Sequence, residues 1–166
     1  QLAIDLTRGR LWVTERDGNR IARFDLATET WQEYDLSTAG GAREPWGLAL
    51  DTAGNVWFAE TAVDQIGKLD AASGIVTEYG PLAAGSQPWG VALDAAGNVW
   101  FTERAGNKIG RYGPQDAVIE YSLPTPGSQP TDVVVDGQGC AWYAAPGSNR
   151  IGRVCRTYTY LPLVSR

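Results

Sequence analysis

The chain has 166 residues, of which 43% are hydrophobic and 10% aromatic, enough for a packed core and unlike disordered or fibrous sequences. Its 14 basic and 19 acidic residues give a net charge of −5, and the basic residues are scattered, so we expect neither a nucleic-acid partner nor binding to an anionic membrane. No apolar run approaches the ~18 residues of a membrane span, and no secretory signal opens the chain. The chain begins at Gln1 and contains no methionine, which suggests a processed form or a fragment.

Four copies of one unit make up the chain. A tryptophan recurs every ~42 to 45 residues, a period typical of propeller blades, and an isoleucine follows each tryptophan at a fixed offset. These pairs are Trp12 and Ile21, Trp57 and Ile66, Trp100 and Ile109, and Trp142 and Ile151. The sequence therefore predicts an all-β fold, a β-propeller of four-stranded antiparallel blades, either four-bladed or part of a larger propeller. The expected blades are 1–40, 41–83, 84–125 and 126–166.

The units differ in how closely they follow the pattern. The first begins inside its first strand, at 2–5, without the Pro-Trp-Gly that precedes this strand in the next two units. Short apolar runs flanked by Asp, Gly and Asn predict strands at 45–51, 56–60, 65–69 and 75–79 in the second unit. The third unit repeats them at 88–93, 98–103, 107–111 and 118–121. The fourth replaces Trp-Gly by Thr131-Asp132, and terminal divergence is typical of capping units.

Both cysteines lie in the last unit. If 139–144 and 150–155 are adjacent antiparallel strands around a Gly147-Ser148 turn, Cys140 and Cys155 lie directly opposite each other and can form a disulfide. This pairing would favour an oxidising, extracellular or cell-surface location. Two buried, reduced thiols are the alternative.

The motifs Pro-x-Gly, Gly-Asn-Val-Trp-Phe-x-Glu and Asn-Lys-Ile-Gly-Arg, present over nearly the whole chain, resemble the repeat of the virginiamycin B lyase (streptogramin lyase) family. The resemblance implies a seven-bladed propeller in full-length relatives, and an activity, magnesium-dependent ring opening of a cyclic depsipeptide by elimination. In the active enzymes that chemistry depends on histidines after the proline, one of them in a Glu-Pro-His-Gly segment whose glutamate binds the metal. This chain reads Glu44-Pro45-Trp46-Gly47 there and contains no histidine, so it lacks an imidazole base.

A single retained glutamate is also a poor magnesium site, because Mg²⁺ prefers several oxygen ligands. We therefore expect no metal, no cofactor and no catalytic residues in these four blades. Glu15, Glu60 and Glu103 recur at the end of one strand and could form a ring of carboxylates, but a repeated local role, such as accepting hydrogen bonds at the strand end, is the favoured interpretation. The Asp51 and Asp94 turns have calcium-like letters but too few ligands, so they are interpreted as turns in which Gly and Asn supply positive φ.

Trp12, Trp57, Trp100 and Trp142 are expected in the cores between blades. Trp46 and Trp89 are different, because the resemblance places the residue between proline and glycine on an innermost strand at the channel mouth. Beside Glu44, Gln87, Gln129 and Thr131, two flat aromatic rings would suit stacking on a sugar, a peptide or a partner loop. The alternative is that the two rings plug a narrow pore.

The sequence favours a non-catalytic extracellular β-propeller that serves as a binding or structural module for a protein or glycan partner. Self-association, or further blades, would complete the propeller. The main alternative is a fragment of a streptogramin-lyase-like enzyme whose catalytic blades lie outside this chain. A sugar-acid lactonase on a related propeller would need a central carboxylate cluster, which the sequence does not show.

Overall fold

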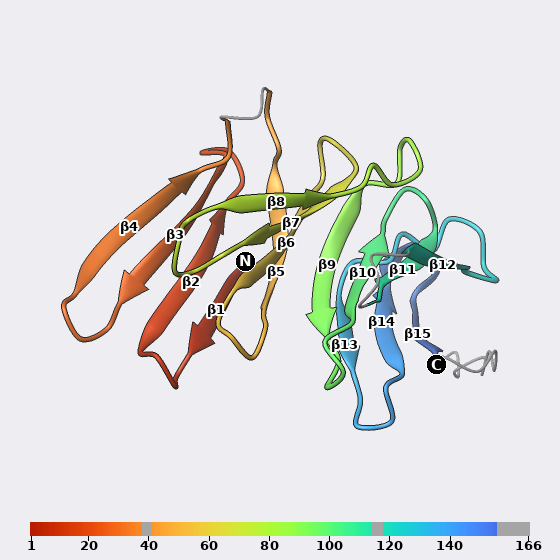
Figure 1. The fold of residues 1–166 in the computed structure, drawn as a ribbon. Coiled ribbons are helices and arrows are strands. Elements are labelled where there is room, and N and C mark those ends of the chain that lie inside the picture. Colours follow the sequence, from red (N-terminus) through yellow and green to blue (C-terminus); the bar gives the residue numbers. More distant parts are fainter. Residues whose placement is uncertain (38–40, 114–117, 156–166) are drawn as a thin grey trace.

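A computed structural model describes residues 1–37, 41–113 and 118–155. In these residues the chain forms four antiparallel sheets, one for each repeat and in chain order (Figure 1). The strands are β1 (Leu2–Asp5), β2 (Arg10–Glu15), β3 (Arg20–Asp25) and β4 (Thr30–Asp35); β5 (Pro45–Leu50), β6 (Val56–Glu60), β7 (Gln65–Leu69) and β8 (Val76–Tyr79); β9 (Pro88–Leu93), β10 (Val99–Glu103), β11 (Lys108–Tyr112) and β12 (Val118–Ser122); and β13 (Val133–Val135), β14 (Ala141–Ala145) and β15 (Arg150–Val154). The predicted all-β, repeated-sheet architecture is confirmed.

Each sheet is a meander, and the predicted strands match the observed ones to within two residues. The last sheet has three strands in the described part of the chain, with a short 3-10 turn, Pro146–Ser148, between β14 and β15. Residues 156–166 of the expected last blade lie outside the described residues, as do 38–40 and 114–117 of the earlier ones. No helix among the described residues is long and apolar enough to cross a membrane.

The four sheets stack as blades in a row. Strands β1, β5, β9 and β13 are the innermost, and β5 packs on β1, β9 on β5 and β13 on β9. In Figure 1 the outermost strand of the first blade, β4, and the last strand, β15, lie at opposite ends of the row. Each internal blade is therefore covered on both faces, which explains why its strands do not alternate cleanly between polar and apolar residues.

Three apolar cores join consecutive blades. We call the face turned to the following blade the forward face; it carries the repeated tryptophan and isoleucine, as Trp12 and Ile21 do in the first blade. The backward face, turned to the preceding blade, carries apolar residues of the inner strands, such as Leu48 and Phe58 in the second blade. The same two faces meet in the cores between the second and third and between the third and fourth blades.

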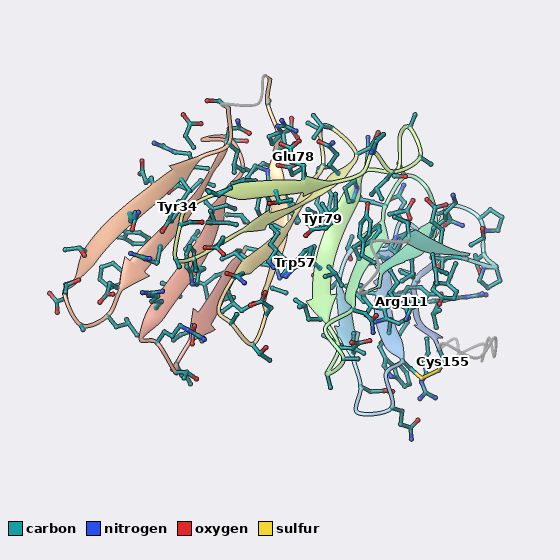
Figure 2. All side chains as sticks on the ribbon, viewed as in Figure 1. Tyr34, Trp57, Glu78, Tyr79, Arg111 and Cys155 are labelled. Atoms are coloured by element: carbon teal, nitrogen blue, oxygen red, sulfur yellow. A yellow bond between two sulfur atoms is a disulfide. The ribbon has the colours of Figure 1, made fainter. Side chains whose placement is uncertain are left out.

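The repeated tryptophans all lie under a cation, but they are not equally buried. A basic side chain from the directly opposite residue of the next strand lies 5.1–5.7 Å from each ring centroid. These pairs are Trp12 with Arg23, Trp57 with Lys68, Trp100 with Arg111, and Trp142 with Arg153. Trp12 and Trp100 are fully buried, as expected, whereas Trp57 and Trp142 are only half-buried. Figure 2 shows Trp57 beside Tyr79, with ring centroids 4.9 Å apart.

An aspartate organises each turn that precedes a repeated tryptophan in the last three blades. The Asp94 carboxylate accepts hydrogen bonds from the backbone N–H and side-chain amide of Asn98 and from the indole N–H of Trp100, the last at 3.1 Å. Asp51 and Asp136 bind the indoles of Trp57 and Trp142 in the same way. These are turns, not cation sites. The sequence predicted that both Gly and Asn supply positive φ in these turns. The glycines do have positive φ, whereas the asparagines contribute hydrogen bonds instead.

The last hairpin has the register that the sequence predicts. Ala141 lies opposite Val154 and Ala144 opposite Ile151. The structure joins Cys140 to Cys155, one residue beyond this paired segment, by a disulfide with a Cα–Cα distance of 4.3 Å (Figure 2). The disulfide thereby ties the start of β14 to the chain that follows β15.

The backward face of the third blade depends on a glycine beneath a ring. A Cβ on Gly110 would lie 2.2 Å from the Phe101 ring, and the same geometry recurs at Gly67 beneath Phe58. The first blade has Val13 opposite Ala22 at these positions. A smaller side chain on one strand is thus matched by a larger one on the next.

We predict that Gly110→Ala destabilises the protein by about 1–3 kcal/mol, because the new methyl group overpacks the core. Combining it with Phe101→Val reproduces the first blade, so the double variant should lose less stability than the sum of the two single variants. Urea denaturation of all four proteins measures the coupling. Additivity to within ~0.5 kcal/mol would contradict direct contact between the two positions.

Candidate functional site

Glycines bring the innermost strands unusually close at one end of the propeller. A Cβ on Gly47 would lie 2.1 Å from the carbonyl oxygen of Trp89, and one on Gly90 would lie 2.3 Å from that of Thr131. No side chain fits in this space, so only glycine allows neighbouring strands to approach so far. The close approach places the residue before each glycine beside its counterpart on the next blade. This is the structural reason for the repeated Pro-x-Gly.

Trp46 and Trp89 are consequently in contact. They are the second residues of β5 and β9, and their ring centroids lie 4.1 Å apart with a 38° angle between the ring planes. The Arg16 guanidinium lies 5.3 Å from the Trp46 centroid, and that of Arg104 lies 4.7 Å from the Trp89 centroid. We call this end of the innermost strands the mouth. It carries a row of four side chains in successive contact, Arg16, Trp46, Trp89 and Arg104, which we call the mouth row. Both rings are half-buried, so they are neither a fully buried plug nor freely exposed platforms.

The residue before the proline that opens the innermost-strand segment of the last three blades (Pro45, Pro88 and Pro130) has a strained backbone. Glu44, Gln87 and Gln129 have φ of 50°, 50° and 48°. A left-handed conformation is uncommon outside glycine, and a following proline restricts the backbone further. Hydrogen bonds hold the Gln87 turn in place, since its N–H donates to Asp64 Oδ1 at 2.8 Å and its carbonyl accepts from the Arg104 N–H at 3.0 Å. Strain supported in this way at a repeated position is typical of functional sites.

An open pocket of about 470 Å³ lies beside the mouth row. Of the residues proposed from the sequence, Glu44, Gln87 and Trp89 line it, whereas Trp46 is not a lining residue and packs against Trp89. Gln129 and Thr131 are not among its lining residues. The Thr131 carbonyl instead accepts a hydrogen bond from Thr102 Oγ1 at 3.0 Å, and this bond joins the third blade to the fourth. The volume falls within the range of small-molecule sites, about 300–1,000 Å³.

The pocket also contains residues that the sequence analysis missed, namely Arg16, Asp64 and Arg104. Arg16 and Arg104 directly follow the repeated glutamates Glu15 and Glu103, so their common place in two units was a signal that could have found them. Asp64 had a repeat signal too, since Asn19, Asn107 and Asn149 stand at the same place after the other repeated tryptophans, all with positive φ. Its carboxylate accepts the backbone N–H groups of Gly85 and Gln87.

The two arginines differ in charge compensation. Arg16 donates to Glu44 Oε2 from Nη2 at 2.5 Å and from Nε at 3.2 Å, and this carboxylate raises the pKa of the guanidinium further. Arg104 has no carboxylate within ion-pair distance among the described residues, and its Nε is buried without a hydrogen-bond partner there. Arg104 is therefore a cation on an aromatic face without a direct carboxylate partner among the described residues, in a pocket whose lining also includes the Asp64 carboxylate. Such a site favours an anionic group attached to an apolar or flat body.

The three repeated glutamates have separate local partners. Glu15 accepts a hydrogen bond from Arg20, and the buried Glu103 accepts one from Ser86 Oγ at 2.7 Å. The fully buried Glu60 lies 3.6 Å from Arg43, and burial raises its pKa to about 7. Within the described ranges no group of three or more acidic or cysteine side chains is placed to hold a metal ion.

The fold and the mouth define the class of protein, a β-propeller of short antiparallel blades with a ligand-sized pocket beside its innermost strands. The sequence profile of the virginiamycin B lyase family matches residues 3–160. The chain belongs to this family. No curated protein sequence matches it.

Solved structures give the same result. A catalytically inactive virginiamycin B lyase from Staphylococcus aureus with quinupristin is 30% identical, with a TM-score of 0.87 over 96% of this chain and 53% of the lyase. A streptogramin B lyase is 28% identical, with a TM-score of 0.88 over 96% of this chain and 52% of the lyase. A chain of a nidogen/laminin complex, 15% identical with a TM-score of 0.76 over 92% of this chain and 57% of its own, shares the fold alone. The chain thus spans about half the length of the lyases that it resembles.

We predict that the stability of the protein falls as the pH rises from about 5 to 8. Burial raises the folded-state pKa of Glu60 to about 7, whereas the ordinary pKa of a glutamate is 4.5, so in this range the folded state retains a proton that the unfolded state has released. The loss amounts to about 3 kcal/mol at most, since one pKa unit corresponds to about 1.4 kcal/mol. Glu60→Gln should match the wild type at pH 5 and be more stable at pH 8.

Urea denaturation at each pH measures this difference, with the exposed Glu33→Gln as the control. Burial also raises the pKa of Glu103, so a remaining slope of the same sign is expected in Glu60→Gln. Parallel stability profiles for Glu60→Gln and the wild type would show that Glu60 does not titrate in this range.

Proposed function

We propose that this propeller is a non-catalytic binding module that recognises an anionic ligand at the mouth row. The observation that carries the proposal is the Arg104 guanidinium, which lies over the Trp89 ring in an open pocket without a carboxylate partner among the described residues. A cation on an aromatic base suits a carboxylate on a sugar or on a peptide side chain. A glycan with acidic sugars or an acidic peptide segment fits this chemistry, with Glu44 and Gln87 as hydrogen-bonding neighbours.

An extracellular or cell-surface location is part of this proposal. It rests on the Cys140–Cys155 disulfide, because disulfides persist mainly in oxidising compartments. The absence of histidine supports a role without catalysis, since the position after Pro45 holds Trp46 where the family's enzymes have a catalytic histidine. Trp46 instead packs against Trp89, with the two ring planes tilted by 38°, and in this proposal it forms part of the binding surface.

We expect an array of neutral and uronic-acid glycans and acidic peptides to reveal binding to acidic members. Arg104→Gln should weaken that binding by about 1.5–3 kcal/mol through loss of a charged hydrogen bond. The double variant Trp46→Ala/Trp89→Ala should weaken it by about 1–3 kcal/mol through loss of stacking. Calorimetric titration with the strongest array ligand measures both effects.

Arg10→Gln is the matched control, because Arg10 begins β2 whereas Arg16 follows its end, so Arg10 lies at the opposite end of the blade. Equal weakening by the control would mean that net charge, not the mouth, determines binding. If the double tryptophan variant loses about 3–5 kcal/mol of folding stability, the rings are a core plug and the site is wrong.

The alternative function is that of a fragment of a streptogramin-lyase-like enzyme with its catalytic blades outside this chain. Family membership favours it. We expect the chain alone not to linearise virginiamycin B in the presence of magnesium, because these blades lack an imidazole base. Chromatography of the reaction mixture measures the linear product, and formation above the uncatalysed rate would favour the enzyme over the binding module.

A further inference from the structure

A second pocket lies between the first and second blades, beside their outermost strands β4 and β8. Its volume is about 360 Å³, and it shares no lining residue with the pocket beside the mouth row. Figure 2 shows one of its lining residues, Glu78, on β8. The lining combines three carboxylates with three apolar side chains, namely Asp35, Glu60 and Glu78 with Leu36, Ile75 and Val76. We call this pocket the carboxylate cleft.

Glu60 is fully buried in the cleft, yet no described residue donates a hydrogen bond to either of its carboxylate oxygens. Its ion-pair partner, Arg43, places Nη1 3.6 Å from Oε2, which is beyond hydrogen-bond distance. Arg43 instead donates to Gln65 Oε1 at 2.8 Å and lies 2.8 Å from Glu78 Oε1. A buried carboxylate without a donor is costly and requires an explanation, and a bound cation in the cleft supplies one.

The other internal blade and the first blade place a cation where the second blade has none. The residue directly opposite the repeated glutamate is Arg20 in the first blade and Lys108 in the third, but Gln65 in the second. In the first blade that cation contacts two glutamates at the positions that Glu60 and Glu78 occupy in the second. The second blade therefore keeps both carboxylates and lacks the basic side chain between their strands.

Arg43, from the loop before β5, replaces this cation only in part. Its guanidinium reaches Glu78 at hydrogen-bond distance but not Glu60. Asp35 brings a third carboxylate from the first blade, and Arg20, which lies opposite Asp35, is already engaged by two glutamates of its own blade. The cleft thus has more carboxylates than cations to neutralise them.

We propose that the carboxylate cleft binds an alkylammonium group, which belongs either to a free amine or to a lysine side chain. Three N–H donors on the ammonium supply the hydrogen bonds that Glu60 lacks. The alkyl chain lies on Val76 and on Ile75, an apolar residue that is 64% exposed beside the carboxylates. A metal ion fits less well, because it needs several oxygen ligands around one point, and the described part of the chain places no three acidic side chains in that way.

Titration calorimetry at pH 8 with n-butylamine tests the proposal, with 1-butanol as the uncharged probe of the same length. An alkylamine keeps its proton at this pH, as lysine does, and Glu60, whose pKa burial raises to about 7, is ionised. Saturable binding of the amine and none of the alcohol is expected. Tighter binding of cadaverine than of Nα-acetyl-lysine amide indicates a free amine as the natural ligand, and the reverse order indicates a lysine side chain.

Two variants locate the binding. Glu60→Gln should weaken it at least about tenfold, because a charged hydrogen bond is lost. Asp35→Asn should weaken it about threefold, as expected for a more exposed charge, and it removes no contact of the buried Arg43. Circular dichroism verifies that each variant is folded.

Glu120→Gln is the matched control, since Glu120 lies opposite Gly110 as Glu78 lies opposite Gly67, but it does not line the cleft. This variant should bind n-butylamine as the wild type does. Weakening by the control equal to that of the cleft variants would show that net charge attracts the amine, and this overturns the proposal. So does a wild-type protein that binds n-butylamine no better than 1-butanol.

Discussion

Packing of a forward face on a backward face is the interaction on which the rest of this structure depends. A single blade is a small twisted sheet with apolar side chains on both sides, and it becomes stable only when neighbours cover them. The match is made pair by pair. Phe101 fits over Gly110, and in the first blade Val13 fits over Ala22, so the combined volume of the two positions is conserved although each residue changes.

The close approach of the inner strands turns this stacking into a site. Gly47 and Gly90 let neighbouring backbones meet, and this contact brings Trp46 and Trp89 together from different blades. The arginines reach the same place from the loops that follow β2 and β10, which can vary without disturbing the blade cores. The stacked blades thus fix where the loop residues of the mouth row lie relative to the two rings.

Equivalent positions in the repeat do not have equivalent environments. Glu60 is buried beside Arg43 with a raised pKa, whereas Glu15 is partly exposed and bound to Arg20. Trp12 is fully buried, whereas Trp57 keeps part of its surface in solvent. The repeat places each residue on the blade, but the side chains of the neighbouring blade determine its solvation and charge. Burial inferred from the repeat alone was therefore correct for some copies and wrong for others.

The sequence by itself determined the fold class, the strands and the register of the last hairpin, because these follow from local apolar patterns, turn residues and a spacing repeated four times. It also selected Trp46, Trp89, Glu44 and Gln87, through their repeated place before or after a proline. Only the tertiary structure decided that the two rings touch, that Arg16 and Arg104 flank them, and that Gln129 and Thr131 lie outside the pocket. Those relations depend on distances between blades that are remote in the chain, and a one-dimensional repeat does not encode them.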